Sequence, residues 1–269
     1  MSAVTTEAST TTNARRTTTS GRLAALGRAE LTLLVRNKTA LFSAVLVPLG
    51  MIGAIKASLG GVNLDKAGMT VAEVAMIGGI GMVLIFAVYA NLATAYTARR
   101  EELVLKRLRT IEAPDREILA GTALPAAALA FTQCAVMIAA GVVFLGLSAP
   151  QQPVVLVLGV LGGLVLLTAL AATTSAFTRT VESAQLTTMP LFLISVVGSG
   201  LFVPLDALPD TVASVCELLP VTGVMTLIRA GWLGGVEGYD LLGAALNALA
   251  WTVLAVFAVQ RWFRWEPRR

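Results

Sequence analysis

The sequence predicts an all-α, polytopic membrane protein with six transmembrane helices. Apolar residues make up 56% of the 269-residue chain and charged residues only 13%, whereas soluble domains contain about 45–50% and about 25%. The mean hydropathy of the chain is +0.80. Six apolar runs each come close to the roughly 20 residues that a membrane-spanning helix needs. The predicted spans cover residues 40–59, 74–98, 119–147, 154–177, 186–202 and 241–259.

Two segments are expected to precede the membrane domain. Residues 1–19 are rich in threonine and have no apolar period, so we expect a disordered tail. It is not a signal peptide, because no apolar run follows its arginines at the right distance. Residues 20–38 predict an amphipathic interfacial helix with leucines on one face and arginines on the other. Glu30 interrupts the leucine face, either as a carboxylate that reaches water or as a contact to a cytoplasmic partner. Residues 39–269 form the transmembrane domain.

Lysines and arginines are distributed unevenly between the two sides of this domain. Seventeen of the 20 lie in segments that share a side with both termini, and the other three are Lys56, Lys66 and Arg229. Because positively charged short loops stay in the cytoplasm, both termini are expected to be cytoplasmic, in a bacterial plasma membrane. The same bias accounts for the net charge of +4, so no nucleic-acid partner is expected.

Several kinds of chemistry are excluded by residues that the chain lacks. It contains no histidine, which removes Ser-His and Cys-His nucleophiles and His-ligated metal sites. The two cysteines have no metal spacing and imply no disulfide framework; we expect Cys134 to be buried and Cys216 to be an exposed free thiol. No catalytic, cofactor-binding or metal-binding residue is therefore predicted, and we expect that the chain itself is not an enzyme.

The loop between the second and third spans predicts a docking element. In residues 101–112, apolar side chains fall on one helical face and basic side chains on the others. Pro114 ends this helix, since proline lacks the N–H donor, and Asp115 and Glu117 then favour the start of another. A short amphipathic helix with charges of both signs suits contact with a soluble protein. The alternative is a helix held at the membrane surface by anionic lipid.

The segment between the fifth and sixth spans predicts two short helices. Residues 203–210 contain two prolines that end the fifth span, residues 210–219 are too short to cross a bilayer, and Pro220 separates them from a second helix over 221–232. Such a pair is typical of a re-entrant hairpin, whose backbone must be buried in protein or beside a water-filled cavity. It serves either as an outer gate or as a passive structural plug.

These two segments, with the interfacial helix and the six spans, resemble the type-two ABC exporter permeases over nearly the whole chain after residue 19. The residues that carry the resemblance are Leu105-Lys106-Arg107-Leu108-Arg109-Thr110, Pro114, Glu117-Ile118-Leu119-Ala120-Gly121, Phe202-Val203-Pro204-Leu205-Asp206-Ala207-Leu208-Pro209, Leu219-Pro220 and Arg229. The resemblance implies that residues 101–111 are a cytoplasmic coupling helix that touches an ATPase. It also implies that residues 203–232 are the external re-entrant hairpin.

The resemblance further implies partners. The chain lacks the Gly-x-x-x-x-Gly-Lys-Ser/Thr motif that cradles nucleotide phosphates, so ATP and Mg are expected to bind to a separate ABC ATPase subunit. Two ATPase chains and two permease chains, identical or paralogous, are implied per transporter. The candidate residues for coupling to the ATPase are Glu101, Leu105, Arg107, Leu108, Arg109, Pro114 and Glu117. The candidates for the outer hairpin are Phe202, Pro204, Leu208, Pro209 and Pro220.

The substrate pathway is expected between spans two and five, which line the central cavity of related exporters. Its candidate residues are Phe86, Asn91, Thr94, Thr188, Phe192, Ser195 and Ser199. The alternative is ordinary packing, because small and hydroxylated residues let membrane helices approach closely. Asn91 is singled out as a buried membrane amide. Apolar and hydroxyl groups suit a small hydrophobic or amphipathic compound, such as a drug, an antibiotic or a lipid-like molecule.

Three other classes of membrane protein remain open. Ion-coupled secondary transporters usually carry Asp, Glu or His in their spans, and spans two to six contain none. An intramembrane enzyme could use Gly198-Ser199-Gly200, but no histidine or nearby lysine is present to activate Ser199. A purely structural or sensory membrane subunit is the third alternative.

Overall fold

The computed structural model describes residues 50, 53, 69–102, 115–144, 146–201, 205, 209–236 and 238–263. Several predictions fall outside this part of the chain: the disordered tail, the interfacial helix, the first span and the middle of the predicted coupling helix. Of the predicted site residues, the following also lie outside the described residues: Leu105, Arg107, Leu108, Arg109, Pro114, Phe202, Pro204 and Leu208.

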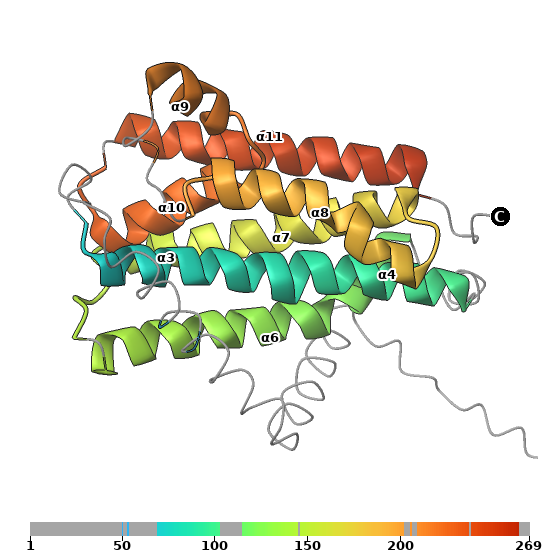
Figure 1. Cartoon of the computed structure of the whole chain (residues 1–269), viewed down its shortest axis with the longest axis horizontal. Coiled ribbons are helices and arrows are strands. Elements are labelled where there is room, and N and C mark those ends of the chain that lie inside the picture. Colours follow the sequence, from blue (N-terminus) through green and yellow to red (C-terminus); the bar gives the residue numbers. More distant parts are fainter. Residues whose placement is uncertain are drawn as a thin grey trace, which may run out of the picture.

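All long elements in the described part of the chain are helices, and they run side by side as one bundle (Figure 1). In chain order they are α3 (Val71–Val83), the π-helix η2 (Leu84–Ala90), α4 (Asn91–Glu101), α6 (Asp115–Phe144), α7 (Pro153–Phe177), α8 (Val181–Gly198), α9 (Asp210–Glu217), α10 (Thr222–Leu233) and α11 (Gly238–Trp262). Because α3, η2 and α4 follow one another without a break, they form a single rod.

Five of these helical stretches are long and apolar enough to cross a membrane: Val71–Glu101, Glu117–Val143, Pro153–Phe177, Val181–Gly198 and Gly238–Trp262. They correspond to the second to sixth predicted spans. A sixth membrane-spanning segment is present only if α9 and α10 are treated as one span. The pair is bent by 101° at the break between the two helices. The prediction of a helical bundle with several membrane spans is therefore confirmed for this part of the chain.

The predicted limits of the fifth span need correction at both ends. The helix begins at Val181 and not at Leu186, because the side chains of Thr180 and Ser183 form a capping box that starts it. It stops at Gly198, before Phe202, since Gly200 adopts a positive φ of 69°. Glycine adopts this left-handed conformation easily and commonly ends a helix.

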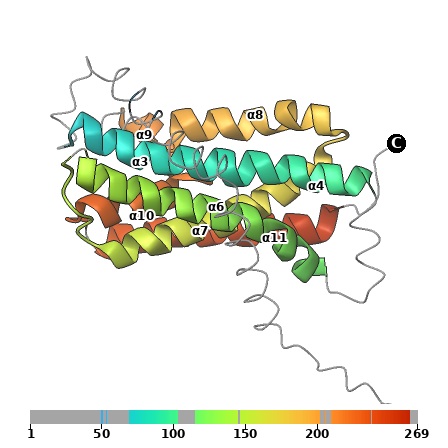
Figure 2. The same ribbon diagram turned by 90° about the horizontal axis from the view of Figure 1, so that it is seen from below.

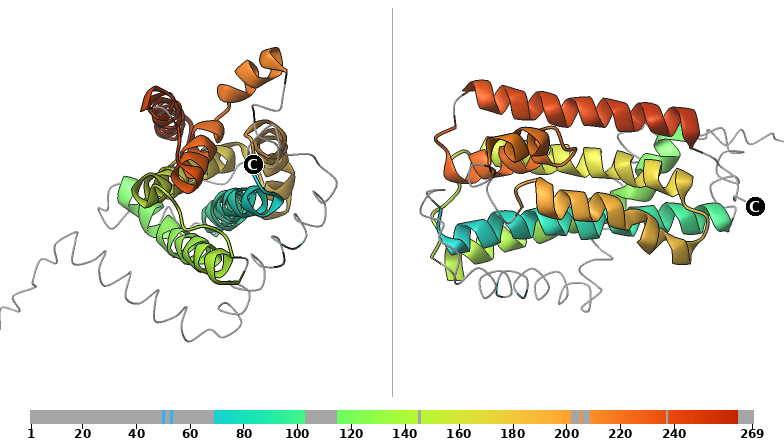
Figure 3. Two further views of the ribbon diagram at one scale, coloured as in Figure 1. Left: turned by 90° about the vertical axis from the view of Figure 1, so that its left-hand side faces the viewer. Right: turned by 45° about the horizontal axis from the view of Figure 1, so that its top comes forward.

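The helical bundle has two ends that differ in the elements they contain. Glu101, the start of α8 and the final turns of α7 and α11 share one end, which we call the Glu101 end; α9 and α10 lie at the other, which we call the α9 end (Figure 1). Figure 2 shows α6 on one side of the α3–η2–α4 rod and α8 on the other. Seen along the bundle in Figure 3, α8 and α11 lie at its periphery.

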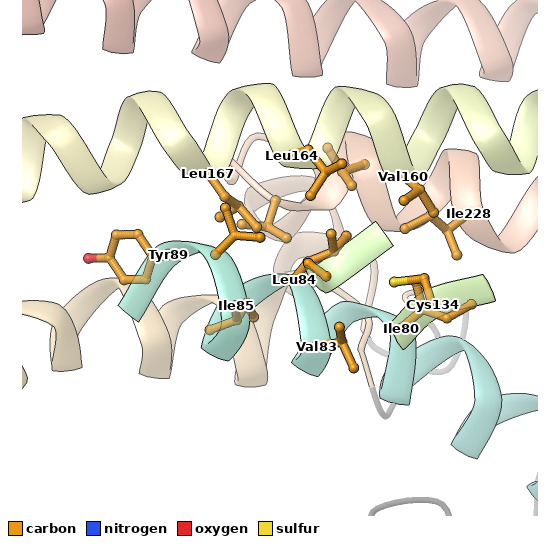
Figure 4. Close-up of a cluster of buried hydrophobic side chains, with 14 of the residues drawn as sticks. Ile80, Val83, Leu84, Ile85, Tyr89, Cys134, Val160, Leu164, Leu167 and Ile228 are labelled. Carbon is orange, nitrogen blue, oxygen red and sulfur yellow. The ribbon is translucent and has the colours of Figure 1, made fainter. Parts of the chain in front are cut away.

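The hydrophobic core lies where α7 contacts η2 and α10. Leu84 of η2 points toward Leu164 and Leu167 of α7, as Figure 4 shows, and all three side chains are buried. On the other side of α7, glycines allow a close approach to α10. A methyl group added at Gly231 would lie 2.6 Å from the Cα of Leu156, so only glycine fits at this helix crossing.

The turn between α6 and α7 fastens α10 to this core. The backbone N–H groups of Gln151 and Gln152 donate to the carbonyls of Trp232 and Gly231, at 3.1 and 2.9 Å. The indole of Trp232 is 1% exposed. The end of α10 is therefore held by backbone bonds as well as by packing.

Candidate functional site

A cavity of about 400 Å³ lies between the α3–η2–α4 rod and α8. Two rings of its lining contact each other: the centroids of Phe86 and Phe192 are 5.2 Å apart and the planes are inclined by 46°. The cavity is lined by Ile85, Phe86, Tyr89, Ala90, Asn91, Thr94, Gln185, Thr188, Met189 and Phe192. Spans two and five thus meet at the place where the sequence predicts a pathway.

The π-helix positions the wall that the rod contributes. The backbone N–H of Asn91 donates to the carbonyl of Phe86, five residues earlier, which is the spacing of a π turn. Tyr89, which also lines the cavity, is buried, and its hydroxyl lies 3.1 Å from Oγ1 of Thr174 on α7. Because Tyr89 fixes η2 against α7, Phe86 and Asn91 are presented toward α8. π-Turns inside α-helices are frequent at functional sites.

The lining of the cavity is uncharged and mostly apolar. The hydroxyls of its two threonines donate within their own helices: Thr94 donates to the carbonyl of Ala90 at 3.0 Å and Thr188 to that of Gln185 at 2.9 Å. The side-chain amides of Asn91 and Gln185 supply the remaining polar groups. In the described part of the chain, no cluster of Cys, Asp or Glu could hold a metal ion. The cavity is therefore suited to a ligand with aromatic or aliphatic surface and one or two hydrogen-bonding groups.

Five of the seven predicted pathway residues come together here: Phe86, Asn91, Thr94, Thr188 and Phe192. Ser195 and Ser199 do not line the cavity; both are buried, and Ser199 is the residue that ends α8. The backbone N–H of Ser199 donates to the carbonyl of Ser195 at 3.1 Å. These two serines therefore take part in ordinary helix packing, which is the alternative to a role in the substrate pathway. The part of the prediction that made Asn91 a buried amide is wrong for the single chain, in which its side chain is exposed.

Gln185 is the lining residue that the sequence analysis missed most clearly. It is a polar residue one turn before Thr188 and Met189, within an apolar helix. The predicted span began at Leu186, so Gln185 was left outside it. The capping pattern at Thr180 and Ser183 is the signal that places the start of the helix earlier and Gln185 inside it.

At the Glu101 end, the two residues that precede the predicted coupling helix bind to two neighbouring helices. Arg99 donates to Oγ1 of Thr122 on α6 at 2.9 Å. Arg100 is 1% exposed; it donates to the carbonyl of Ser175 at 2.7 Å and also to that of Thr178. A guanidinium at the end of α7 satisfies carbonyls that have no partner within the helix and interacts favourably with the helix dipole.

Two of the predicted coupling residues are described at this end. Glu101 is the last residue of α4, and its Oε1 accepts a hydrogen bond from the backbone N–H of Val181 at 3.1 Å. Glu117 is exposed near the start of α6. In the sequence Arg99 and Arg100 are recognisable only as positive charges, because no pattern in the sequence identifies which carbonyls a buried arginine will reach.

At the α9 end, α9 and α10 differ in burial. Pro209 precedes α9, and Pro220 is buried at the break between the two helices. Most of α9 is exposed, including Val215 at 62% and Leu218 at 71%, whereas most of α10 is buried. The prediction that Cys216 is an exposed thiol is wrong: it is 9% exposed, because it faces the end of α8 near Gly198.

Side chains of α11 hold the break between α9 and α10. Nδ2 of Asn247 donates to the carbonyl of Glu217 at 2.8 Å, and Nε1 of Trp251 donates to that of Leu218 at 2.8 Å. These bonds satisfy carbonyls at the C-terminal end of α9. The two short helices are thus connected to the last span as well as to the core.

Apolar spans around an uncharged cavity, with a bent helix pair between the last two of them, define a multi-pass membrane protein of the transporter class. The sequence matches the family ABC-2 type transporter over residues 22–233, well over half of the chain. The protein therefore belongs to the ABC-2 type transporter family, and it is a transmembrane permease chain. None of the curated proteins matches the sequence.

Proposed function

We propose that this chain is the permease of an ATP-driven exporter that moves a small hydrophobic or amphipathic compound out of a bacterial cell. A separate ABC ATPase binds ATP and Mg and supplies the energy. The observation that carries the proposal is the uncharged cavity between the rod and α8. Its aromatic pair and two amides favour an apolar ligand with few polar groups over a polyanion, since no cation lines it.

The location of the charged residues supports contact with the ATPase at the Glu101 end. Among the described arginines, Arg99, Arg100, Arg116, Arg179 and Arg261 belong to this end, and Arg229 belongs to α10. Positive residues favour the cytoplasmic side. Residues 103–114, which connect α4 to α6, are therefore proposed to be cytoplasmic and to couple the permease to the ATPase, and the α9 end is proposed to face outward.

Exposed apolar side chains beside the cavity support a second permease chain. Phe86 is 49% exposed at the mouth of the cavity, and Leu193 and Val197 of α8 are 54% and 76% exposed. A second copy packed on this surface would enclose the cavity and convert it into part of a shared pathway. The second chain is either identical or a paralogue.

The test is transport by proteoliposomes that contain the permease and the ATPase that co-purifies with it. The neutral dye Nile red serves as the hydrophobic probe and calcein as the polyanionic one. We expect ATP-dependent movement of Nile red and none of calcein. Replacing both Phe86 and Phe192 by alanine removes the aromatic pair and should lower Nile red transport by about thirtyfold or more, because each ring contributes about 1–2 kcal/mol to ligand contact.

Phe257→Ala is the matched control, since Phe257 is 60% exposed on α11 and does not line the cavity. Its transport should equal that of the parent protein. Transport of Nile red that requires an ion gradient but no ATP would instead establish an ion-coupled carrier. Calcein transport at the same rate would contradict the proposed substrate class.

A further inference from the structure

Both ends of α8 are held by charged side chains from other helices. At its start, the carboxylate of Glu101 on α4 accepts a hydrogen bond from the backbone N–H of Val181 at 3.1 Å. Beyond its end, the guanidinium of Arg229 on α10 donates to the carbonyl of Gly200. Each charge has the sign that the adjacent helix dipole favours, and each bond is charge-assisted.

Between these two contacts α8 is loosely packed. Only 22% of its residues are buried, whereas half of those in α7 are. Pro190 lies inside the helix and has no N–H, so the carbonyl of Leu186 has no partner four residues later. The inner face of this same helix carries Gln185, Thr188, Met189 and Phe192, which line the cavity. The position of the cavity wall therefore depends strongly on the contacts at the two ends of α8.

The two contacts come from different functional segments. Glu101 lies next to the segment 103–114, for which coupling to the ATPase is proposed above. Its neighbour Arg100 donates to the carbonyl of Ser175 near the end of α7, so this end of α4 is linked to both α7 and α8. Arg229 belongs to the bent α9–α10 pair at the opposite end. Thus α8 connects the proposed ATPase side with the proposed outer hairpin.

We propose that Glu101 and Arg229 are positioning residues for the transport cycle, which set the placement of α8 against the cavity. Glu101 passes displacement of the 103–114 segment to the start of α8, and Arg229 retains its far end on α10, so that α8 tilts and changes the shape of the cavity. The role of Glu101 rests on the proposed function. The role of Arg229 is a property of this chain alone.

A native thiol reports on the Arg229 contact without any ATPase. The Cys134→Ala variant leaves Cys216 as the single cysteine. A methyl group added at Gly198 would lie 3.5 Å from the sulfur of Cys216, so the end of α8 covers this thiol. A water-soluble maleimide is applied to the purified variant in detergent, where it reaches this end of the bundle whichever side of the membrane the α9 end faces. Arg229→Ala should raise the labelling rate of Cys216 by about fivefold or more, because release of α8 uncovers the thiol.

Two further variants complete this experiment. Arg229→Lys retains one donor and should give an intermediate rate, and Arg261→Ala removes an exposed arginine at the opposite end of the bundle and should leave the rate unchanged. Equal labelling of Arg229→Ala and the parent would overturn the role of Arg229. Rapid labelling in all variants, including the parent, would show that α8 does not cover Cys216. This result would also overturn the role of Arg229.

The Glu101 contact is tested by the ratio of Nile red transported to ATP hydrolysed, in proteoliposomes with the co-purified ATPase. Glu101→Ala should lower this ratio by about fivefold or more, since loss of the bond uncouples α8 from α4. Glu101→Gln keeps an oxygen that accepts from Val181 and should retain most of the ratio. Glu102→Ala is the matched control, because Glu102 is the next residue and is exposed.

The outcomes separate this inference from the proposed function. Equal ratios for Glu101→Ala and Glu102→Ala would overturn the role of Glu101. Loss of the ATPase from the Glu101→Ala complex would make Glu101 a docking residue and would overturn it too. If no ATPase co-purifies with the parent chain, the proposed function fails together with the role of Glu101, whereas labelling of Cys216 still decides the role of Arg229.

Discussion

Two consecutive spans, α7 and α8, have similar apolar sequences but are held in different ways. α7 lies inside the bundle, where it contacts η2 and α10 and keeps half of its residues buried. α8 lies at the periphery, with 22% of its residues buried and an internal proline. Since local stability follows packing and buried apolar contact, α7 is expected to stay fixed while α8 moves.

The arginines that cap the C-terminal ends of α7 and α8 also differ in burial. Each receives an arginine from another helix near its C-terminal end: Arg100 for α7 and Arg229 for α8. Arg100 is 1% exposed and donates to two carbonyls, whereas Arg229 is only partly buried. For α7 the arginine adds to a large packed surface, and for α8 it is one of few fixed points. Similar caps thus have different consequences in the two helices.

The largest expected effect is on the crossing of α7 and α10. Gly231→Ala places a methyl group against the backbone of Leu156, which cannot move as a side chain can. Overpacking costs typically 1–3 kcal/mol, and we expect a loss of about 3 kcal/mol or more in the free energy of unfolding. Thermal unfolding of the purified protein in detergent is the measurement. Gly243→Ala is the control, because nothing lies within 4 Å of a methyl group added there; equal melting temperatures would contradict the close helix crossing.

A smaller loss is expected at the cap of α7. Arg100→Ala leaves the carbonyls of Ser175 and Thr178 without this donor in a buried place, which should cost about 2 kcal/mol in unfolding free energy. Arg100→Lys should recover part of the loss, since one ammonium reaches one carbonyl. Arg179→Ala removes an exposed arginine nearby and should change the melting temperature little. If both alanine variants melt alike, the cap does not stabilise α7.

Sequence patterns alone predicted the bundle because membrane spans depend on length and hydropathy, which are local properties. They also paired spans two and five through the family resemblance, and five of the candidate residues line one cavity. Helical periodicity in the sequence predicts that Ser195 and Ser199 share a face with Thr188. They turn away because α8 ends at Gly198 and its final turn packs inward, a tertiary effect that periodicity does not contain.

The features that the sequence did not predict depend on contacts between distant segments. The π-helix at 84–90 contains only residues that are ordinary in an apolar α-helix. The burial of Cys216 follows from the packing of α9 against the end of α8. Arg100 and Glu101 are adjacent charges at the end of α4, yet they reach different helices, 75 and 80 residues away in the sequence. Charge and spacing identify such residues without identifying their partners.

The smallest expected effect distinguishes α7 and α8 directly. Hydrogen exchange of backbone amides, followed by mass spectrometry in detergent, should be faster in α8 than in α7, because α8 has fewer buried contacts. Pro190→Ala supplies an N–H that can bond to the carbonyl of Leu186. One such bond adds about 1 kcal/mol to the local free energy of opening, which slows exchange in α8 by about fivefold. Exchange in α7 should not change, because Pro190 is exposed and points away from the core. Equal protection of the two helices in the parent protein would mean that the few contacts of α8 suffice to fix it, and α8 could then not be the moving wall of the cavity.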